Sequence, residues 1–446
     1  MIEVKFDNTL ELPKIVMPLY NESRDNDPDA GSSGPGAQTK MDGIFAPLFR
    51  LNSYTIPFQQ VMSMELWCDT VPMIRVRLND TLGIAKSLDN PSNDNVLQMQ
   101  ILPKFDNAYK KINLLFYITA CEIRGATINL EGIYNVPQFW DTDMTAFGKL
   151  SSYEFYEKIA KKYQLGFCSN INGTNDKRYI YSTNTNILQL MENEIAYSGN
   201  EEHVYDFWID YWNNINFIDL YNEYRLILKD DDMKIWITPM QYNDSDDLDD
   251  QQPIEVTATI GNAPNMTGTP LFTHTYTPIT ASSMITDQII EIFNIDTREA
   301  ENIVVIDGDI KNDIFKSYTY FGENVGEHNY LYSKATREMF LNKINGQCIE
   351  VTLHQPALGL IRGGKVNFIF FDINKYTTQD VQLNTLVESN IPLPDDIITE
   401  DSKYIVNRSV SGQYYIMNSS ITYSGNQWKQ VLRLGRYADK VNKYTE

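Results

Sequence analysis

The stretch from Ser151 to Leu220 constrains the fold of this chain more than any other part of the sequence. Ser151 lies three residues before Glu154, the spacing of a capping box, in which the two side chains satisfy backbone donors at a helix N-terminus. Apolar side chains then recur at helical spacing, at Tyr153, Tyr156, Ile159, Ala160 and Tyr163. The pattern predicts an amphipathic helix. Gly166 predicts its end, because glycine readily adopts the left-handed conformation.

Further segments extend this stretch with alternating strands and helices. Residues 178–181 have the composition of a short strand, and a second helical pattern begins near Asn186. Its apolar positions are Ile187, Leu190, Met191 and Ile195. Two aromatic-rich runs follow at 205–212 and 216–219. Together these segments predict an α/β module.

The region before this module predicts antiparallel β structure. Runs of strand length occupy 62–67, 73–78, 96–102, 112–118, 121–124 and 126–130, with turn residues between them. Ile74, Val76 and Leu78 alternate with Arg75 and Arg77, as expected of a strand with one buried face. The run 112–118 is almost continuously apolar, which predicts a strand covered on both faces. A small barrel or sandwich fits these short strands.

The C-terminal hundred residues return to β sequence. Strand patterns occupy 348–353, 366–371, 411–417 and 428–434, with a Gly-rich turn at 357–365 and a hairpin turn at 424–426. The fold class predicted is β-rich α+β, with two antiparallel β domains around an α/β module. The predicted division is 1–43 (an N-terminal strand and flexible arm), 44–137 (first β domain), 138–235 (α/β module), 236–339 (irregular connecting domain) and 340–446 (second β domain).

The N-terminal region combines a possible strand at 2–6 with polar, Gly/Pro/Ser-rich sequence at 21–43. Such a composition does not bury a core and predicts a flexible loop or tether. Two interpretations remain open for this region. It is either an arm whose strand adds to a neighbour's sheet, or a simple linker.

Charge and cysteine content exclude several classes of protein. The 37 basic and 59 acidic residues give a net charge of −22, which repels phosphate backbones and argues against binding to duplex DNA. Cys68, Cys121, Cys168 and Cys348 lie far apart and predict buried free thiols rather than disulfides. No apolar run approaches the ~18 residues of a membrane span. The N-terminus lacks the pattern of a signal peptide, so we expect maturation in a cytoplasm.

Metal and cofactor motifs are absent from the sequence. The histidines, His203, His274, His328 and His354, form no zinc-binding pair. The acidic run 243–250 fails the EF-hand pattern and predicts a solvated loop. The Gly-rich segment 359–365 joins two predicted strands, whereas phosphate-binding loops lead into helices. We therefore expect no metal, no cofactor and no catalytic residues.

The strongest enzymatic candidate is the pair Asp206 and Asp210, flanked by Trp208, Tyr211 and Trp212. Paired carboxylates beside aromatic platforms are typical of glycosidases. The two carboxylates share a face on either a helix or a strand. The alternative interpretation is a solvated edge beside a buried aromatic stripe. A carbohydrate-active or carbohydrate-binding protein acting on cell-wall glycan is thus the rival hypothesis of function.

The order of motifs resembles the central baseplate hub proteins of contractile phage tails and the hub portion of type VI secretion spike proteins. The hub helix pattern Ser-x-x-Glu-Phe-x-x-x-Ile-Ala-x-x-Tyr-x-Leu-Gly-Phe is met by Ser151, Glu154, Phe155, Ile159, Ala160, Tyr163, Leu165, Gly166 and Phe167. Further similar segments are 207–211, 216–219, 359–363 with Val366, 411–416 and 428–434. The resemblance covers about 44–235 and 340–446, whereas the loops 21–43 and 376–403 and residues 240–335 depart from it.

The resemblance implies a structural protein of the virion that is assembled in the host cytoplasm. Hub proteins carry two tube-like β-barrels per chain and form homotrimers, so that six barrels match a hexameric tail tube protein on one side and a central spike protein on the other. Baseplate wedge proteins are further implied partners. DNA would only pass through the channel, and the acidic charge would keep it from sticking. The spike is expected to be a separate polypeptide.

Overall fold

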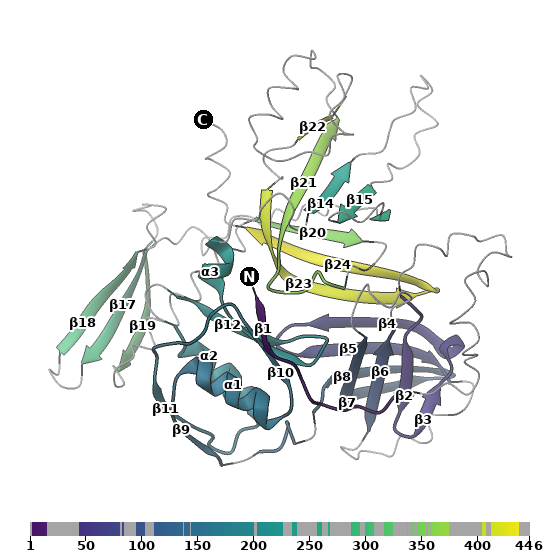
Figure 1. The fold of residues 1–446 in the computed structure, drawn as a ribbon, viewed down its shortest axis with the longest axis horizontal. Coiled ribbons are helices and arrows are strands. Elements are labelled where there is room, and N and C mark those ends of the chain that lie inside the picture. Colours follow the sequence, from purple (N-terminus) through teal and green to yellow (C-terminus); the bar gives the residue numbers. More distant parts are fainter. Residues whose placement is uncertain are drawn as a thin grey trace. The chain divides into compact units, whose positions relative to one another are not determined.

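The chain divides into two units in the computed structural model. Figure 1 shows its helices and strands. The first unit contains Met1–Ala196, Tyr205–Asp219 and Ser420–Gln430, and the second contains Tyr197–Val204, Leu220–Ser419 and Val431–Glu446. The structure describes residues 2–15, 44–80, 83, 95–102, 111–136, 138–142, 144–199, 203–225, 234–238, 257–260, 266–267, 287–294, 299–306, 316–323, 337, 340–341, 344, 347–353, 356, 358–373, 404–406 and 412–436. The described part is predominantly β with few helices, which confirms the predicted β-rich α+β class.

Antiparallel strands form the β part of the first unit. Its strands are β2 (Leu48–Leu51), β3 (Tyr54–Ile56), β4 (Val61–Cys68), β5 (Pro72–Asn79), β6 (Val96–Ile101), β7 (Ile112–Arg124) and β8 (Thr127–Tyr134). Their order is β4-β5-β8-β7-β6-β2-β3, and each neighbouring pair is antiparallel. In β5 the alternation predicted for this strand is confirmed, since Ile74, Val76 and Leu78 are buried and Arg75 and Arg77 are exposed.

Strand β7 differs from the sequence-based prediction. Residues 112–124 form one strand of 13 residues, where two separate strands were predicted. The pairing of β7 with β8 has a register irregularity between Ile118 and Ala120, and the strand continues on both sides of it. Its first half alternates between buried and half-buried residues, so the predicted cover on both faces is wrong. The reason is that the apolar residues Leu115 and Tyr117 lie on the less covered face.

Most of the predicted α/β module lies in the first unit, whereas its residues 197–204 and 220–235 belong to the second. It contains β9 (Ala146–Leu150), α1 (Ser152–Lys162), β10 (Gly166–Ser169), β11 (Arg178–Tyr181), α2 (Ile187–Ala196), β12 (Tyr205–Ile209), β13 (Asn214–Asp219) and the N-terminal strand β1 (Glu3–Phe6). One sheet has the order β1-β10-β13-β12, and β9 pairs with β11. Helix α1 covers this sheet through aromatic contacts. The rings of Tyr156 and Phe217 stack 4.7 Å apart, and those of Tyr153 and Phe167 meet edge to face at 5.2 Å.

The two ends of α1 give one confirmation and one correction. Ser151 and Glu154 form the predicted capping box. At the other end Gln164, and not Gly166, has a positive φ, of 60°. Gly166 is instead the first residue of β10, where a Cβ atom would collide with the side chain of Asn214. Glycine is required there for close approach between neighbouring strands, and not for the helix end.

The N-terminal strand pairs within its own chain. β1 is antiparallel to β10, with Val4 opposite Cys168. Beyond it the backbone carbonyl of Pro13 accepts hydrogen bonds from the amides of Gln98 and Gln100 in β6. The predicted strand is therefore confirmed, but it adds to this chain's sheet and not to a neighbour's. The predicted flexible segment 21–43 lies outside the described residues.

As far as the structure describes it, the second unit contains the short helix α3 and a majority of β strands. Its elements are α3 (Leu220–Arg225), β14 (Lys234–Thr238), β15 (Thr257–Ile260), β16 (Met266–Thr267), β17 (Asp287–Asn294), β18 (Glu299–Ile306), β19 (Lys316–Glu323), β20 (Gln347–Leu353), β21 (Lys365–Ile373) and β22 (Tyr404–Val406). β18-β17-β19 form a separate sheet of three strands. Strand β23 (Gly412–Ser424) begins in the second unit, and strand β24 (Gln427–Arg436) ends in it. The hairpin turn between them, with residues 420–430, belongs to the first unit.

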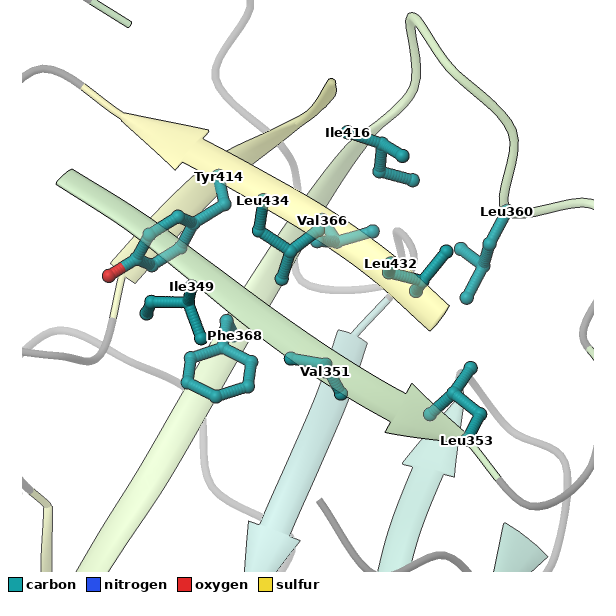
Figure 2. Close-up of a cluster of buried hydrophobic side chains, with 10 residues drawn as sticks. All are labelled: Ile349, Val351, Leu353, Leu360, Val366, Phe368, Tyr414, Ile416, Leu432 and Leu434. Atoms are coloured by element: carbon teal, nitrogen blue, oxygen red, sulfur yellow. The ribbon is translucent and has the colours of Figure 1, made fainter. Parts of the chain in front are cut away.

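A cluster of buried side chains holds the β strands of the second unit together. Figure 2 shows its ten residues converging between the strands: Ile349, Val351, Leu353, Leu360, Val366, Phe368, Tyr414, Ile416, Leu432 and Leu434. Those from β20 recur at every second position, as in β5. The predicted Gly-rich segment before β21 joins two strands, as expected, and Gly363 donates its amide hydrogen to the carbonyl oxygen of Ile416 at 3.0 Å.

Several predictions stay untested. The acidic run 243–250, the loop 376–403 and His274, His328 and His354 lie outside the described residues. The five-part division of the chain stays a prediction. None of the helices that the structure describes is long and apolar enough to cross a membrane.

Candidate functional site

The carboxylates Asp206 and Asp210 are both buried in the first unit. Asp206 lies within β12, and Asp210 follows its last residue. The backbone of the β12–β13 turn surrounds Asp210. One oxygen accepts hydrogen bonds from the amides of Trp212 at 2.8 Å and Asn214 at 2.9 Å, and the other accepts from the side chains of Asn214 and Asn216. Asp210 thus holds the turn together.

Burial decides the chemistry of this carboxylate. The loss of hydration raises the pKa of Asp210 above its ordinary value, and the four hydrogen bonds oppose that rise. Trp208 and Tyr211 are also buried, so neither offers a ring for stacking on a sugar. The predicted buried aromatic stripe is confirmed, but the predicted solvated edge is wrong. The arrangement fits a structural clamp better than a glycosidase pair.

A second buried charge cluster gave no signal in the sequence. Arg178 in β11 forms ion pairs with Asp176 at 3.0 Å and with Glu194 of α2 at 2.9 Å. Burial raises the pKa of Glu194 despite the opposing attraction of Arg178. For Asp176 the desolvation is outweighed by hydrogen bonds, chiefly from Ser152 and Thr174, and by Arg178, so its pKa lies below the ordinary value. Glu194 lies 16 residues from Arg178, so no local motif marks this pair.

This cluster also closes the N-terminus of α1. The amide of Ser152 donates to Asp176 at 3.0 Å, that of Tyr153 to Thr174 at 3.1 Å and that of Glu154 to Ser151 at 3.3 Å. Helix N-termini attract anions because their amides lack partners. Here Asp176, Thr174 and Ser151 accept these hydrogen bonds, so the N-terminus of α1 is tied to the segment before β11.

One exposed face of β4, β5 and β8 carries a ladder of opposite charges. Arg75 of β5 lies between Glu65 of β4 and Glu131 of β8, which are its cross-strand neighbours. Its guanidinium contacts Glu131 at 2.9 Å and Glu65 at 3.4 Å. These bonds raise the pKa of Arg75, mainly through Glu131. All three side chains are exposed, so the ladder orders a solvent-facing surface more than it stabilises the fold.

Two long hairpins in the chain follow the same plan. The first joins β7 to β8 through Gly125 and Ala126, and the second joins β23 to β24 through Gly425 and Asn426. β7 and β23 each contain 13 residues. The strand orders also correspond, β6-β7-β8-β5 for the first hairpin and β21-β23-β24-β20 for the second. Each residue of the first hairpin therefore corresponds to the residue 300 positions later, since 425 − 125 = 300.

The backbones of the two hairpins differ near the turn. Residues 420–424 of the second hairpin pair with β4. The corresponding residues 120–124 have only β8 as a neighbour among the strands that the structure describes, because β6 pairs with β7 only at 112–117. Among the described strands, the tip of the first hairpin thus has a neighbour on one side only.

The side chains of the two tips differ in the same way. Ile421 and Tyr423 are 0% and 3% exposed. Their counterparts are Cys121, which is exposed, and Ile123, which is 52% exposed. An apolar side chain and a thiol therefore face solvent at the positions that the second hairpin buries. This tip is the candidate interaction site of the described chain.

Metal-binding groups and cysteines do not indicate a further site among the described residues. Within the described residues, no group of three or more His, Cys, Asp or Glu side chains is arranged to hold a metal ion. The prediction of free thiols is confirmed for all four cysteines, and that of burial for Cys68, Cys168 and Cys348. Cys121 is exposed, and none of the described strands pairs with the outer side of the tip that carries it.

Comparison with known proteins gives structural matches only. No family model and no curated protein matches the sequence. A tail protein from Neisseria meningitidis MC58 is 9% identical with a TM-score of 0.44, over 88% of this chain and 97% of that one. The 43 kDa tail protein of prophage MuSo2 from Shewanella oneidensis is 8% identical with a TM-score of 0.46, over 88% and 98%.

A third solved structure comes from a secretion system. It is a component of the type VI secretion system of E. coli, described as structurally similar to the T4 bacteriophage tail proteins gp27 and gp5. It is 8% identical with a TM-score of 0.38, over 87% of this chain and 76% of that one. The matches are thus to phage tail proteins and to a type VI secretion component, the two classes that the sequence resembles. At TM-scores below 0.5 they carry no argument on function.

Proposed function

We propose that this chain is a structural hub of a contractile phage-tail baseplate, without catalytic activity. Three copies form a ring that joins the hexameric tail tube to the trimeric central spike, with wedge proteins around it and a channel for DNA. The protein then belongs to the virion and is assembled in the host cytoplasm.

One observation carries this proposal. The chain contains two sets of four strands built around equivalent hairpins, β6-β7-β8-β5 and β21-β23-β24-β20. Three copies of such a chain present six equivalent sets. A ring of this kind therefore combines threefold symmetry of the whole chain with approximate sixfold symmetry of its β parts, which is what an adaptor between a trimer and a hexamer needs.

Native mass spectrometry combined with particle averaging tests the proposal. A hub gives a mass of three times 51.4 kDa and particles with a central hole and six similar lobes. A chain that stays monomeric at every concentration contradicts it. The six lobes are the critical feature, because a trimer with only three lobes would not relate threefold to sixfold symmetry.

The rival carbohydrate hypothesis gives the opposite result in an activity assay. Purified protein is incubated with cell-wall glycan, and release of soluble sugar is measured for the wild type and for Asp206→Asn. The hub releases none in either case. Turnover that Asp206→Asn abolishes while the circular dichroism spectrum is unchanged would overturn the proposal.

A further inference from the structure

The two-stranded sheet of β9 and β11 exposes large apolar side chains on the first unit (Figure 1). Met144, Tyr179 and Tyr181 are 78%, 74% and 62% exposed, the highest values among the large hydrophobic residues that the structure describes. The amide of Ser182 donates to the carbonyl oxygen of Thr145 at 2.8 Å, so Met144 precedes a residue that bonds the end of β11. Single exposed apolar residues are common on proteins, whereas several on one small sheet indicate an interaction surface.

The alternation of β11 places both tyrosines on the outer face of this sheet. Ile180, between them, is buried. Side chains two positions apart on a strand share a face and lie about 6–7 Å apart. Tyr179 lies opposite Lys149 and Tyr181 opposite Ala146, and both of these residues of β9 are exposed. The outer face therefore combines two phenol rings with a lysine.

The inner face anchors the sheet to the rest of the module. Phe147 of β9 is buried, and its ring meets that of Phe155 in α1 edge to face at 5.3 Å. Arg178, the first residue of β11, forms the ion pairs with Asp176 and Glu194. A surface that is ordered before binding loses less conformational entropy when a partner binds. The tyrosines are thus presented by a folded platform.

The charge of this region is opposite in sign to that of the whole chain. Residues 144–182 contain six basic and three acidic residues, a net charge of +3, whereas the whole chain carries −22. Lys149 and Lys177 are exposed beside the tyrosines, one across the strand pair and one along the chain. Lys158 of α1 donates to the carbonyl oxygen of Phe147 at 3.2 Å and adds a further charge next to β9. Such a region is complementary to a negatively charged partner.

We propose that Met144, Tyr179 and Tyr181 dock an acidic segment of another protein. Tyrosine and methionine are enriched where proteins bind one another, and tyrosine is among the residues that contribute most of the binding energy. Lysines at the rim of the contact select a partner that carries carboxylates. A nucleic acid is disfavoured, because the charge of −22 on the whole chain repels a phosphate backbone. The inference goes beyond the proposed function and does not depend on the ring.

A defined peptide tests this contact on the full chain. The probe is a labelled synthetic peptide that alternates glutamate with leucine, so that an extended conformation offers leucines to the tyrosines and carboxylates to the lysines. The comparison peptide has glutamine in place of every glutamate. By fluorescence anisotropy at low salt, we expect the acidic peptide to bind at least about tenfold more tightly than the glutamine peptide. Equal affinity, or no binding of the acidic peptide, overturns the proposal.

Variants of the tyrosines connect the binding to this surface. Tyr179→Thr combined with Tyr181→Thr should weaken binding of the acidic peptide by about tenfold or more, because both rings are lost. Tyr54→Thr is the matched control, since Tyr54 is an exposed strand tyrosine of β3, and it should leave the affinity unchanged. Threonine keeps the preference for β structure, and an unchanged circular dichroism spectrum verifies the fold. A double variant that binds like the wild type contradicts the docking site.

Two further measurements exclude other occupants. Lys149→Glu should weaken binding of the acidic peptide by about threefold or more, and heparin, an anionic glycan, should not compete with the peptide. Competition by heparin that depends on the two tyrosines would assign the surface to a glycan and overturn the proposal. Loss of self-association in the double tyrosine variant would assign it to a second copy and also overturn the proposal. A double variant that loses the peptide but still forms the ring leaves the proposed function intact.

Discussion

The two long hairpins share a plan but differ in what covers their tips. In both, the half far from the turn packs into a β core. Phe116 and Gly132 in the first hairpin correspond to Ile416 and Leu432 in the second, all of them buried. The first hairpin thus has a large residue and a glycine where the second has two branched aliphatic residues. A Cβ atom on Gly132 would lie 3.0 Å from the Cβ of Phe116, so the small residue makes room for the large one.

The tips teach that burial in these hairpins depends on strand pairing and not on the hairpin itself. Tyr423 is buried beside Trp428, with ring centroids 5.0 Å apart, where β4 covers the strand. Ile123 is exposed at the same position of the first hairpin, where none of the described strands covers the outer side. Sequence-distant pairing partners therefore decide which residues belong to the core.

The largest difference between the two hairpins is expected when the equivalent residues Tyr423 and Ile123 are each replaced by alanine. Tyr423→Ala removes a buried ring and should lower the free energy of unfolding by about 3–4 kcal/mol. Ile123→Ala should lower it by less than about 1 kcal/mol in the monomer, because the side chain is already half exposed. Urea denaturation at a concentration where the protein is monomeric measures both. Equal losses would mean that the first tip is buried within one chain as well.

The turns provide a smaller difference. In the first turn Gly125 has a φ of 62° and Ala126 has no positive φ, the pattern of a type II′ turn. In the second turn Gly425 and Asn426 both have positive φ, of 58° and 65°, the pattern of type I′. Gly125→Asn should cost about 1–2 kcal/mol in unfolding free energy. Gly425→Asn should cost less than about 0.5 kcal/mol, since Asn tolerates the left-handed region. The reverse order would contradict these turn types.

The ion ladder beside the first hairpin should contribute still less. Glu131 pairs with Arg75, whereas its counterpart in the second hairpin is Val431. A double-mutant cycle with Arg75→Ala and Glu131→Ala should give a coupling below about 1 kcal/mol, because both side chains are exposed. The coupling should vanish in 1 M salt, where the Debye length is about 3 Å. A large coupling that resists salt would indicate a buried pair.

The smallest effect concerns protonation at the first tip. Hydrogen bonds from Arg124 and Asn129 lower the pKa of Glu122 below its ordinary value of 4.5, whereas the counterpart Thr422 does not titrate. A lowered folded-state pKa means that Glu122 adds stability above the ordinary pKa, and this is lost as pH falls through the folded-state value. NMR titration should find a pKa below 4.5 that Arg124→Ala raises. A value that Arg124→Ala leaves unchanged would contradict the assignment.

Local patterns predicted most elements because their causes are local. The capping box at Ser151, the alternation in β5 and the turn near Gly425 each depend on residues a few positions apart. The interpretation of Gly166 was wrong because its reason, the approach of Asn214, lies 48 residues away (214 − 166 = 48). The division of β7 into two strands was wrong because polar residues at its tip looked like a boundary.

The candidate site shows the same limit. Sequence identified Asp210 as a notable carboxylate, but only the structure shows that backbone amides of its own turn surround it. The Arg178 cluster gave no sequence signal, because its members come from β11, α2 and the segment between α1 and β11. Its ion pairs depend on how these elements pack.

By itself the sequence determined most of the helices, strands and tight turns among the described residues, because side-chain periodicity, capping and backbone preferences act over a few residues. It also determined the acidic charge and the resemblance to hub proteins. Only the tertiary structure decided that two hairpins 300 residues apart are equivalent, and that β4 covers one tip while no described strand covers the outer side of the other. The physical reason is that a strand edge is satisfied by hydrogen bonds from another strand, and nothing within the strand specifies where that partner lies in the chain.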